Sequence, residues 1–183
     1  MIKILGISGS LRAKSFNSAL LAAAVKLQPE DAQIEVASIR DIPLYDGDVE
    51  AKGMPAAVDA LKARVVATDA LLLVTPEYNN SLPGVFKNAI DWLSRPSADV
   101  KRVFGNRPVA IIGTSPGSYG TILSQQAWLP VLRTLGTRPW FGGRLQVAHA
   151  QQAFDDTGEL IDEKVRAHLA EFLRGFSAFA AGR

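Results

Sequence analysis

Short apolar runs alternate with segments of helical periodicity along the chain. The run at 69–75 is apolar almost throughout, which is typical of a central parallel strand buried on both faces. The segment 33–39 alternates between apolar and polar residues, so it predicts a strand with one more exposed face. Further strands are expected at 2–7, at 107–114 and, more weakly, at 137–147, where two glycines interrupt the pattern.

Helical patterns separate these strands. The segment 17–27 is rich in alanine and leucine, which are strong helix formers, and 83–93 begins with a proline. Pro130 is expected to bend or divide a helix at 122–135, because proline cannot donate the helical hydrogen bond. Two more helices are expected at 55–67 and 160–180, the latter with a core stripe of Leu160, Val165, Leu169, Phe172, Phe176 and Phe179.

This alternation of strands and helices predicts an α/β fold, with helices on both faces of a five-stranded parallel sheet. Residues 1–183 contain no internal repeat or linker, so we expect a single domain. In open α/β sheets a ligand binds beyond the carboxyl ends of the strands, near the point where the strand order reverses. The loops after the first, third and fourth strands are therefore the candidate site.

Composition and charge exclude several classes of protein. The chain has no cysteine and only two histidines, which excludes a disulfide scaffold and a thiol catalyst and disfavours a metal site. The net charge is +2 and the basic residues are scattered, so we expect no nucleic-acid partner. No run approaches the ~18 apolar residues of a membrane span, and no secretory signal is visible. We expect a cytoplasmic protein without a membrane partner.

The first candidate loop, 6–17, leaves the first strand, is rich in serine and glycine, and leads into a helix. Backbone N–H groups at a helix N-terminus attract anions, and Arg12 can hold phosphate oxygens through two hydrogen bonds. Its spacing matches neither the dinucleotide-binding fingerprint nor the P-loop. The alternative interpretation is an ordinary helix start capped by Ser15 or Asn17. The remaining candidate donors are Ser8 and Ser10.

The other two candidate loops follow the third and fourth strands. Loop 75–84 supplies Glu, Tyr, Asn and Ser side chains between two prolines, an arrangement that suits a polar heterocycle. Loop 113–121 is rich in glycine and serine, and its Tyr119 is placed to cover a ring. Both loops are also explained as ordinary turns, because these residue types favour turns in general.

Together, the loops resemble the NADPH-dependent FMN reductase family. The resemblance rests on Gly-Ser-Leu-Arg-x-x-Ser-x-Asn at 9–17 and on Thr-Pro-Glu-Tyr-Asn-x-Ser-x-Pro-Gly-x-x-Lys-Asn-Ala-Ile-Asp-Trp at 75–92. The stretch 42–46 is similar to the family's loop after the second strand, and the branch with the best match contains chromate and quinone reductases. The resemblance implies a flavodoxin-like three-layer sandwich with strand order 2-1-3-4-5, non-covalent FMN, and NADPH or NADH as the reductant.

The resemblance also implies roles for residues. The phosphate and ribityl chain of FMN would be held from the first loop, the isoalloxazine ring would be flanked by the second, and its pyrimidine side would face the third. No side chain is expected to be catalytic, because the cofactor carries the chemistry. In loop order, the expected cofactor-binding residues are Ser10, Arg12, Ser15, Phe16 and Asn17, then Pro76, Glu77, Tyr78 and Asn79, then Ser115 and Gly117.

The implied activity is hydride transfer from NAD(P)H to flavin N5, followed by reduction of a small-molecule acceptor at the same flavin face in a ping-pong sequence. Quinones, chromate, azo compounds and free flavin all suit an open flavin face. Two alternatives are a flavodoxin-type electron carrier and an FMN-binding scaffold without reductase activity. The net charge of +2 disfavours a carrier that docks basic partners.

The resemblance further implies a homodimer or homotetramer. We expect Tyr45 to approach the flavin pocket of a partner subunit, and Tyr119 to lie on the substrate side of the site. The predicted helix at 83–93 has more apolar side chains than one sheet face requires, which is compatible with burial by a partner or within the same subunit. These side chains are Val85, Phe86, Ile90, Trp92 and Leu93.

Overall fold

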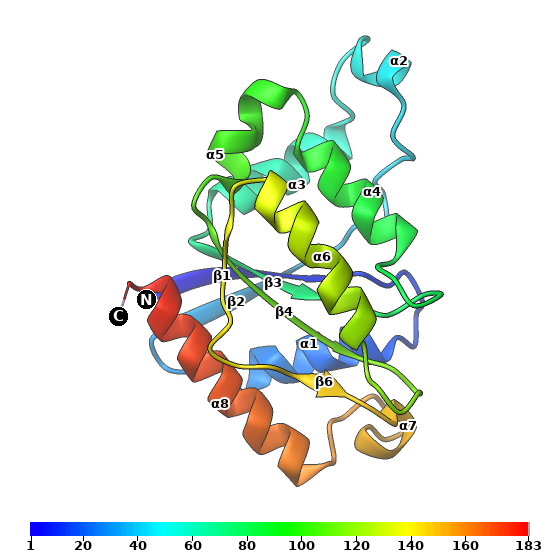
Figure 1. Cartoon of the computed structure of the whole chain (residues 1–183), viewed down its shortest axis with the longest axis vertical. Helices are drawn as coiled ribbons and strands as arrows, with labels where there is room; N and C mark the ends of the chain where they lie inside the picture. Colours follow the sequence, from blue (N-terminus) through cyan, green and yellow to red (C-terminus); the bar gives the residue numbers. More distant parts are fainter. Residues whose placement is uncertain (183) are drawn as a thin grey trace.

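The computed structural model describes residues 1–182, which form a three-layer α/β sandwich (Figure 1). Its parallel sheet has the order β2-β1-β3-β4-β5, as expected, and an additional strand, β6, also pairs with β4. The order reverses between β1 and β3, so the connections from these neighbouring strands leave toward opposite faces. The strands are β1 (Ile2–Ser8), β2 (Ala32–Ala37), β3 (Ala70–Val74), β4 (Pro108–Thr114), β5 (Arg138–Pro139) and β6 (Gln146–Val147).

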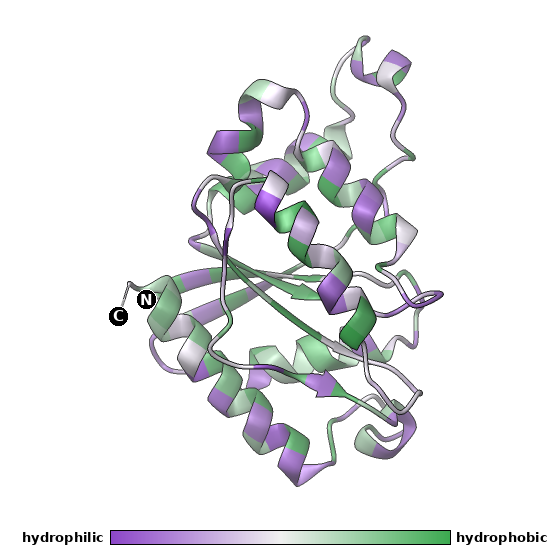
Figure 2. Ribbon diagram, viewed as in Figure 1, coloured by the Kyte–Doolittle hydropathy of each residue, from purple (hydrophilic) through white to green (hydrophobic). Residues whose placement is uncertain are grey.

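Helices cover both faces of the sheet. Helices α1 (Phe16–Lys26) and α8 (Glu163–Ala180) pack on one face, and the opposite face is covered by α3 (Ala56–Val66), α4 (Gly84–Leu93) and α6 (Ile122–Thr134). Hydrophobic residues concentrate in the strands and on the helix sides turned toward them (Figure 2). The short helices are α2 (Gly47–Glu50), η1 (Ser97–Asp99), α5 (Val100–Phe104) and α7 (Ala150–Ala153).

Strand β3 confirms the prediction from its apolar run. All of its residues are buried, and its side chains alternate between the two cores, as the period of a strand requires. Leu72 belongs to the core beneath α1 and α8, whereas Leu71 and Leu73 belong to the core beneath α3, α4 and α6. Because both faces are covered, the strand has no polar face.

The weak fifth strand expected at 137–147, with two glycines interrupting it, is divided into two short strands. Two short strands pair with opposite ends of β4: Arg138 is the partner of Pro108, and Gln146 that of Gly113. Between them the chain passes around Trp140, whose ring lies 4.7 Å from that of Phe172 in an edge-to-face contact. A Cβ added to Gly142 would lie only 2.6 Å from the indole nitrogen of Trp140. The two glycines thus accommodate a bulky side chain that interrupts the strand.

Two expected helices also differ in detail. Helix α6 is not divided by Pro130, which lies inside it at an exposed position, where water can solvate the carbonyl that loses its helical partner. Helix α8 begins at Glu163 rather than at Leu160, because the Asp162 carboxylate caps it by accepting hydrogen bonds from the backbone N–H groups of Lys164 and Val165.

Helix α4 buries most of its apolar side chains within its own subunit. Phe86 packs edge to face on Trp128 of α6, with ring centroids 5.0 Å apart, and both side chains are fully buried. Among the apolar residues noted in the sequence for this helix, only Val85 is exposed. Intrasubunit packing therefore explains the unusual apolar content of α4.

Candidate functional site

Three loops meet at the carboxyl ends of the neighbouring strands β1, β3 and β4, on one side of the sandwich (Figure 1). Loop one (residues 9–15) leads from β1 to α1, loop two (residues 75–83) leads from β3 to α4, and loop three (residues 115–121) leads from β4 to α6. Since the order reverses between β1 and β3, this is the edge of the sheet where open α/β folds bind ligands.

Loop one ends in a helix N-terminus that can bind an anion. Ser15 caps α1, and its hydroxyl accepts a hydrogen bond from the Ser18 N–H at 3.2 Å. The other N–H groups of the first turn have no partner within the helix and carry its partial positive charge. The Phe16 ring packs on Phe154, with ring centroids 5.9 Å apart, so this side chain is used in packing within the chain. Arg12 is exposed and takes part in none of the ion pairs among residues 1–182.

Asn17 joins loop one to the end of β4. Its side-chain amide donates to the Thr114 carbonyl at 2.9 Å, and its side-chain oxygen accepts from the Thr114 N–H at 3.0 Å. The register between β3 and β4 ends at the pair Val74 and Ile112, so Asn17 satisfies backbone groups of β4 beyond that ladder. Asn17 is only 4% exposed, and both the nitrogen and the oxygen of its side-chain amide are used to hold Thr114.

Loop two begins in a buried polar network. The Thr75 hydroxyl accepts a hydrogen bond from the Trp128 indole N–H at 3.1 Å and lies 2.8 Å from the Ser124 hydroxyl. Pro76, the next residue, is buried as well. Loop two is therefore held against helix α6 at the point where it leaves the sheet.

The tip of loop two is a tight turn. Tyr78 and Ser81 exchange backbone hydrogen bonds, and the two residues between them, Asn79 and Asn80, have φ angles of 51° and 61°. Positive φ at both central positions is typical of a type I′ turn, for which asparagine is well suited. This turn leaves Tyr78 44% exposed at the mouth of the site.

Glu77 has a structural role that its sequence position did not indicate. Its carboxylate accepts hydrogen bonds from the backbone N–H groups of Leu123 at 2.9 Å and Ser124 at 3.0 Å. Thr121, at the N-cap of α6, makes no side-chain capping bond, so Glu77 caps the helix from a different loop. Its side chain thereby fixes loop two against the start of α6, the helix into which loop three leads.

Loop three is supported by residues that the sequence did not single out. The Ser115 hydroxyl donates to the Gly120 carbonyl, and the Gly117 carbonyl accepts from the His149 N–H at 3.1 Å. The end of β4 lies so close to the start of loop two and the end of loop three that a Cβ added to Gly113 would lie 2.2 Å from both the Thr75 carbonyl oxygen and the Thr121 hydroxyl. Tyr119 is 81% exposed at the tip of the loop, a position compatible with its expected place on the substrate side.

Tyr45 lies away from the three loops of its own chain. Its ring packs edge to face on Trp92 at 4.9 Å, ~12 Å along α4 from that helix's first residue at 1.5 Å per residue. Its hydroxyl donates to Glu50, which also accepts hydrogen bonds from Arg95. The Arg95 and Tyr45 hydrogen bonds lower the pKa of Glu50, and the bond to Glu50 raises the pKa of Tyr45.

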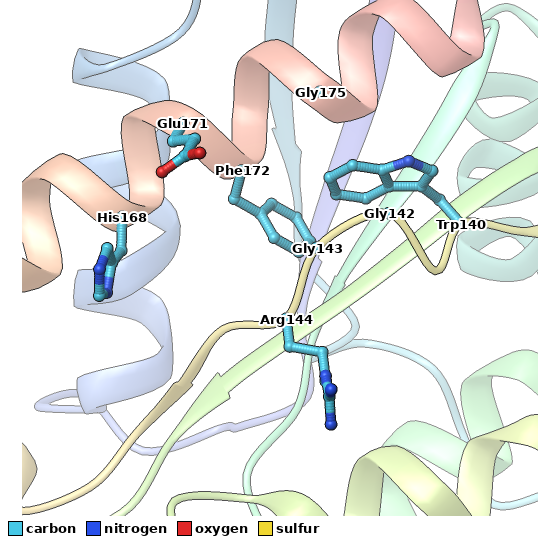
Figure 3. Close-up of a pocket in the computed structure, with 8 residues that line it drawn as sticks. All are labelled: Trp140, Gly142, Gly143, Arg144, His168, Glu171, Phe172 and Gly175. Carbon is cyan, nitrogen blue, oxygen red and sulfur yellow. The ribbon is translucent and has the colours of Figure 1, made fainter.

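The surface contains two cavities of note. One of about 330 Å³ lies between the β5–β6 segment and α8, where the Trp140 and Phe172 rings meet and Arg144 points away from the helix (Figure 3). None of the predicted site residues lines it, although the exposed His168 does. The other, of about 290 Å³, adjoins loop one and includes Ser10 and Arg12.

Two further findings concern residues 1–182. They contain no cluster of histidine and acidic side chains that would hold a metal ion. Their helices also include none with both the length and the hydrophobicity to cross a membrane.

A parallel sheet of order 2-1-3-4-5, with an anion-binding helix start after β1 and polar loops after β3 and β4, defines a flavodoxin-like nucleotide-binding protein. Residues 2–152 match the family model described as NADPH-dependent FMN reductase. The chain belongs to this family, and it is an oxidoreductase whose cofactors are FMN and NAD(P)H.

Individual relatives match nearly the whole chain. The NAD(P)H-dependent FMN reductase PA1204 of Pseudomonas aeruginosa is 46% identical over 173 residues, covering 94% of this chain and 92% of the relative. A quinone reductase of Escherichia coli is 37% identical over 185 residues, covering 97% and 95%. Among solved structures, the flavoenzyme NAD(P)H:(acceptor) oxidoreductase FerB of Paracoccus denitrificans superposes with a TM-score of 0.89 at 34% identity, covering 100% of this chain and 98% of FerB.

The chemistry of the site fits FMN. The first turn of α1 offers uncompensated N–H groups to a phosphate, and the nearby Arg12 has no carboxylate partner among residues 1–182. Gly9 lets loop one lie close to α4, since a Cβ there would be 2.2 Å from the ring of Phe86. Anion-binding groups therefore stand next to two loops rich in backbone donors and acceptors, as a phosphorylated heterocycle requires.

Proposed function

We propose that this protein, acting through the single domain of residues 1–183, reduces quinones with NAD(P)H by means of bound FMN. In the net reaction, NAD(P)H and a proton convert a quinone to its hydroquinone and leave NAD(P)⁺. The observation that carries this proposal is the fixed relative position of the elements that hold the three loops: Asn17 joins the start of α1 to the end of β4, and Glu77 joins loop two to the start of α6. The similarity to a quinone reductase supports the choice of acceptor.

Each loop has a distinct role in this proposal. Ser10, Arg12 and Ser15, with the backbone N–H groups of Phe16 and Asn17, bind the FMN phosphate and ribityl chain. The backbone of loop two, residues 76–79, flanks the isoalloxazine ring, and Ser115 and Gly117 of loop three face its pyrimidine side. FMN supplies two-electron redox chemistry when it is bound, so the chain's own residues need only bind, orient and exclude water.

The kinetic mechanism we propose is ping-pong, with the nicotinamide and the acceptor using one face of the site in turn. Initial rates measured over a grid of NAD(P)H and benzoquinone concentrations should give parallel double-reciprocal lines. Intersecting lines would argue for a ternary complex and against a shared site. Chromate, azo dyes and free flavin are proposed as further acceptors and belong in the same panel.

A flavodoxin-type electron carrier is distinguished from this reductase by one observation. Under anaerobic conditions, NADPH or NADH alone should bleach the absorbance of the FMN-loaded protein within the time of a turnover. A carrier would require a separate reductase for the same change, and a scaffold without redox function would be purified with little flavin.

We also propose that the protein is a cytoplasmic homodimer or homotetramer in which Tyr45 reaches the flavin site of a partner subunit. The segment around α2 supports an interface there, since Leu44 is 81% exposed, Tyr45 41% and Val49 39%. Mass measurement in solution tests the assembly, and a monomeric, fully active protein would refute it. The Tyr45→Ala variant should show an altered acceptor profile, and an unchanged profile would remove Tyr45 from the site.

A further inference from the structure

The cavity of about 290 Å³ beside loop one lies on the β2 side of helix α1. Its walls come from loop one, from α1 and from the end of β2 with the residues that follow that strand. Ser15, Phe16 and Asn17, at the start of α1, do not line it, and Asn17 points toward β4. The cavity thus shares Ser10 and Arg12 with the proposed FMN phosphate site, whereas its wall at Arg40 and the end of β2 lies outside that site.

The chemistry of this cavity suits a phosphate attached to an apolar or sugar-like group. Arg12, Arg40 and four serine residues line it, and no carboxylate does. Because Arg12 is already assigned to the FMN phosphate, Arg40 is the arginine left for a second anion. Guanidinium groups bind phosphate through paired, charge-assisted hydrogen bonds. The remaining wall is apolar and includes Leu21 and Val36.

The Arg40 side chain is held by a hydrogen bond to loop one, and its guanidinium forms no ion pair among the described residues. Arg40 follows β2, and its guanidinium donates to the Leu11 carbonyl of loop one at 2.6 Å. Its backbone N–H donates to the Ser38 hydroxyl at 3.1 Å. This contact to Leu11 uses one of the five N–H donors of the guanidinium.

We propose that this cavity binds the 2′-phosphate of NADPH and that Arg40 makes the enzyme prefer NADPH to NADH. This inference rests on the reductase function proposed above. The 2′-phosphate is the one group that distinguishes the two dinucleotides. The proposal places the adenosine end of NADPH at the end of β2 while its nicotinamide reaches the flavin ring. An arginine near this point reads the 2′-phosphate in other dinucleotide-binding folds.

The kinetic test compares kcat/KM for NADPH and NADH in the wild type and in Arg40→Gln. Glutamine removes the charge but keeps an N–H for the Leu11 carbonyl. The ratio of kcat/KM for NADPH to that for NADH should fall roughly 10- to 100-fold, as expected for loss of a charge-assisted phosphate contact. A wild type without preference for NADPH, or an unchanged ratio in the variant, would overturn the proposal.

Arg64→Gln is a matched control. Arg64 is exposed and donates to the Val36 carbonyl at 2.8 Å, much as Arg40 donates to Leu11, but it lies on α3 and does not line the cavity. The ratio for this variant should equal that of the wild type. A similar fall in both variants would assign the effect to general surface charge and contradict the proposal.

Equilibrium binding measurements test this proposal independently of the proposed reductase function. They also distinguish a site for the 2′-phosphate of NADPH from a site for the phosphate of FMN. Calorimetry of the FMN-loaded protein should show tighter binding of adenosine 2′,5′-bisphosphate than of 5′-AMP, with the difference lost in Arg40→Gln. Titration of apo-protein with FMN and riboflavin should give the same preference for FMN in both proteins. Loss of the FMN preference instead would assign the cavity to FMN. These titrations measure binding without turnover, so they remain a valid test of the site even if the protein proves not to reduce quinones.

Discussion

Asn17→Ala is expected to destabilise the protein more than the loss of an ordinary side-chain amide does. The Asn17 amide makes two hydrogen bonds with the backbone of Thr114, at 2.9 and 3.0 Å, and Thr114 is only 1% exposed. Alanine would therefore leave a buried N–H and a buried carbonyl without these partners, and water has little access to replace them.

The magnitude follows from the environment of these two bonds. A net hydrogen bond contributes about 0.5–1.5 kcal/mol, and an unsatisfied buried polar group costs about 1–3 kcal/mol. The cost of an unsatisfied buried group applies here, and it applies to both the N–H and the carbonyl of Thr114. We therefore expect Asn17→Ala to lower the free energy of unfolding by about 2–5 kcal/mol. The variant should also bind FMN more weakly, since Asn17 aligns loop one with loop three.

Asn88 provides a matched control on helix α4. Its amide likewise makes two hydrogen bonds to backbone, donating to the Pro43 carbonyl at 2.7 Å and accepting from the Tyr45 N–H at 2.8 Å, but this pair is exposed to solvent. Water can replace both partners, so Asn88→Ala should cost about 1 kcal/mol or less and leave FMN affinity unchanged.

The assay is urea unfolding of the apo-protein followed by circular dichroism, with FMN affinity measured separately by quenching of flavin fluorescence. Apo-protein is used because bound FMN would add its own binding free energy to the stability. An Asn17→Ala variant no less stable than Asn88→Ala would refute the argument that burial of the Thr114 groups sets the cost.

Three other predictions address single side chains. Arg12→Ala should weaken FMN binding by about 1.5–3 kcal/mol without affecting riboflavin, and equal losses for both ligands would exclude a phosphate contact. Glu77→Ala should lower stability by about 1 kcal/mol through loss of the α6 cap and raise the Kd for FMN, as denaturant unfolding and flavin titration will determine. Hydrogen bonds from Arg95 and Tyr45 lower the pKa of Glu50, so ionised Glu50 stabilises the packing of the α2 segment. This stabilisation should be fully present above the ordinary pKa of glutamate, about 4.3, and should be lost as the pH falls through the lowered pKa. An NMR titration that finds the pKa of Glu50 at or above its ordinary value would contradict this.

The sequence alone determined the features of this protein that depend on local burial and local turn chemistry. The continuous apolar run of β3 reflects a strand covered on both faces, and its position was predicted to within a residue at each end. The serine-rich segment before α1 indicated a capped helix start, and Ser15 is that cap. The order and spacing of the loop motifs resemble those of the family. Their meeting at one edge of the sheet was predicted separately, from the parallel strands that carry them.

Tertiary structure decided what each polar side chain in those loops contacts. Asn17 and Thr114 are 97 positions apart, and Glu77 lies 46 positions before Leu123, so no local pattern pairs them. Asn17 was expected to hold the phosphate end of the cofactor, and Glu77 was expected to flank the flavin ring largely through its backbone. The structure adds that both side chains bond to distant backbone: Asn17 to the end of β4 and Glu77 to the start of α6. Neither periodicity nor turn propensity carries information about partners at such distances.

Local sequence patterns also did not identify the contact partners of the fifth strand, of Tyr45 or of Arg40. The edge-to-face contact between Trp140 and Phe172, and the two glycines that make room for it, interrupt a segment that reads as one strand. Tyr45 was predicted to approach the flavin pocket of a partner subunit, and its packing on Trp92 within its own chain was not foreseen. Arg40 had no assigned role until the fold brought the end of β2 against loop one. A sequence records how strongly each residue prefers burial or a turn, whereas the identity of its neighbours depends on how the strands and helices pack, which only the assembled fold specifies.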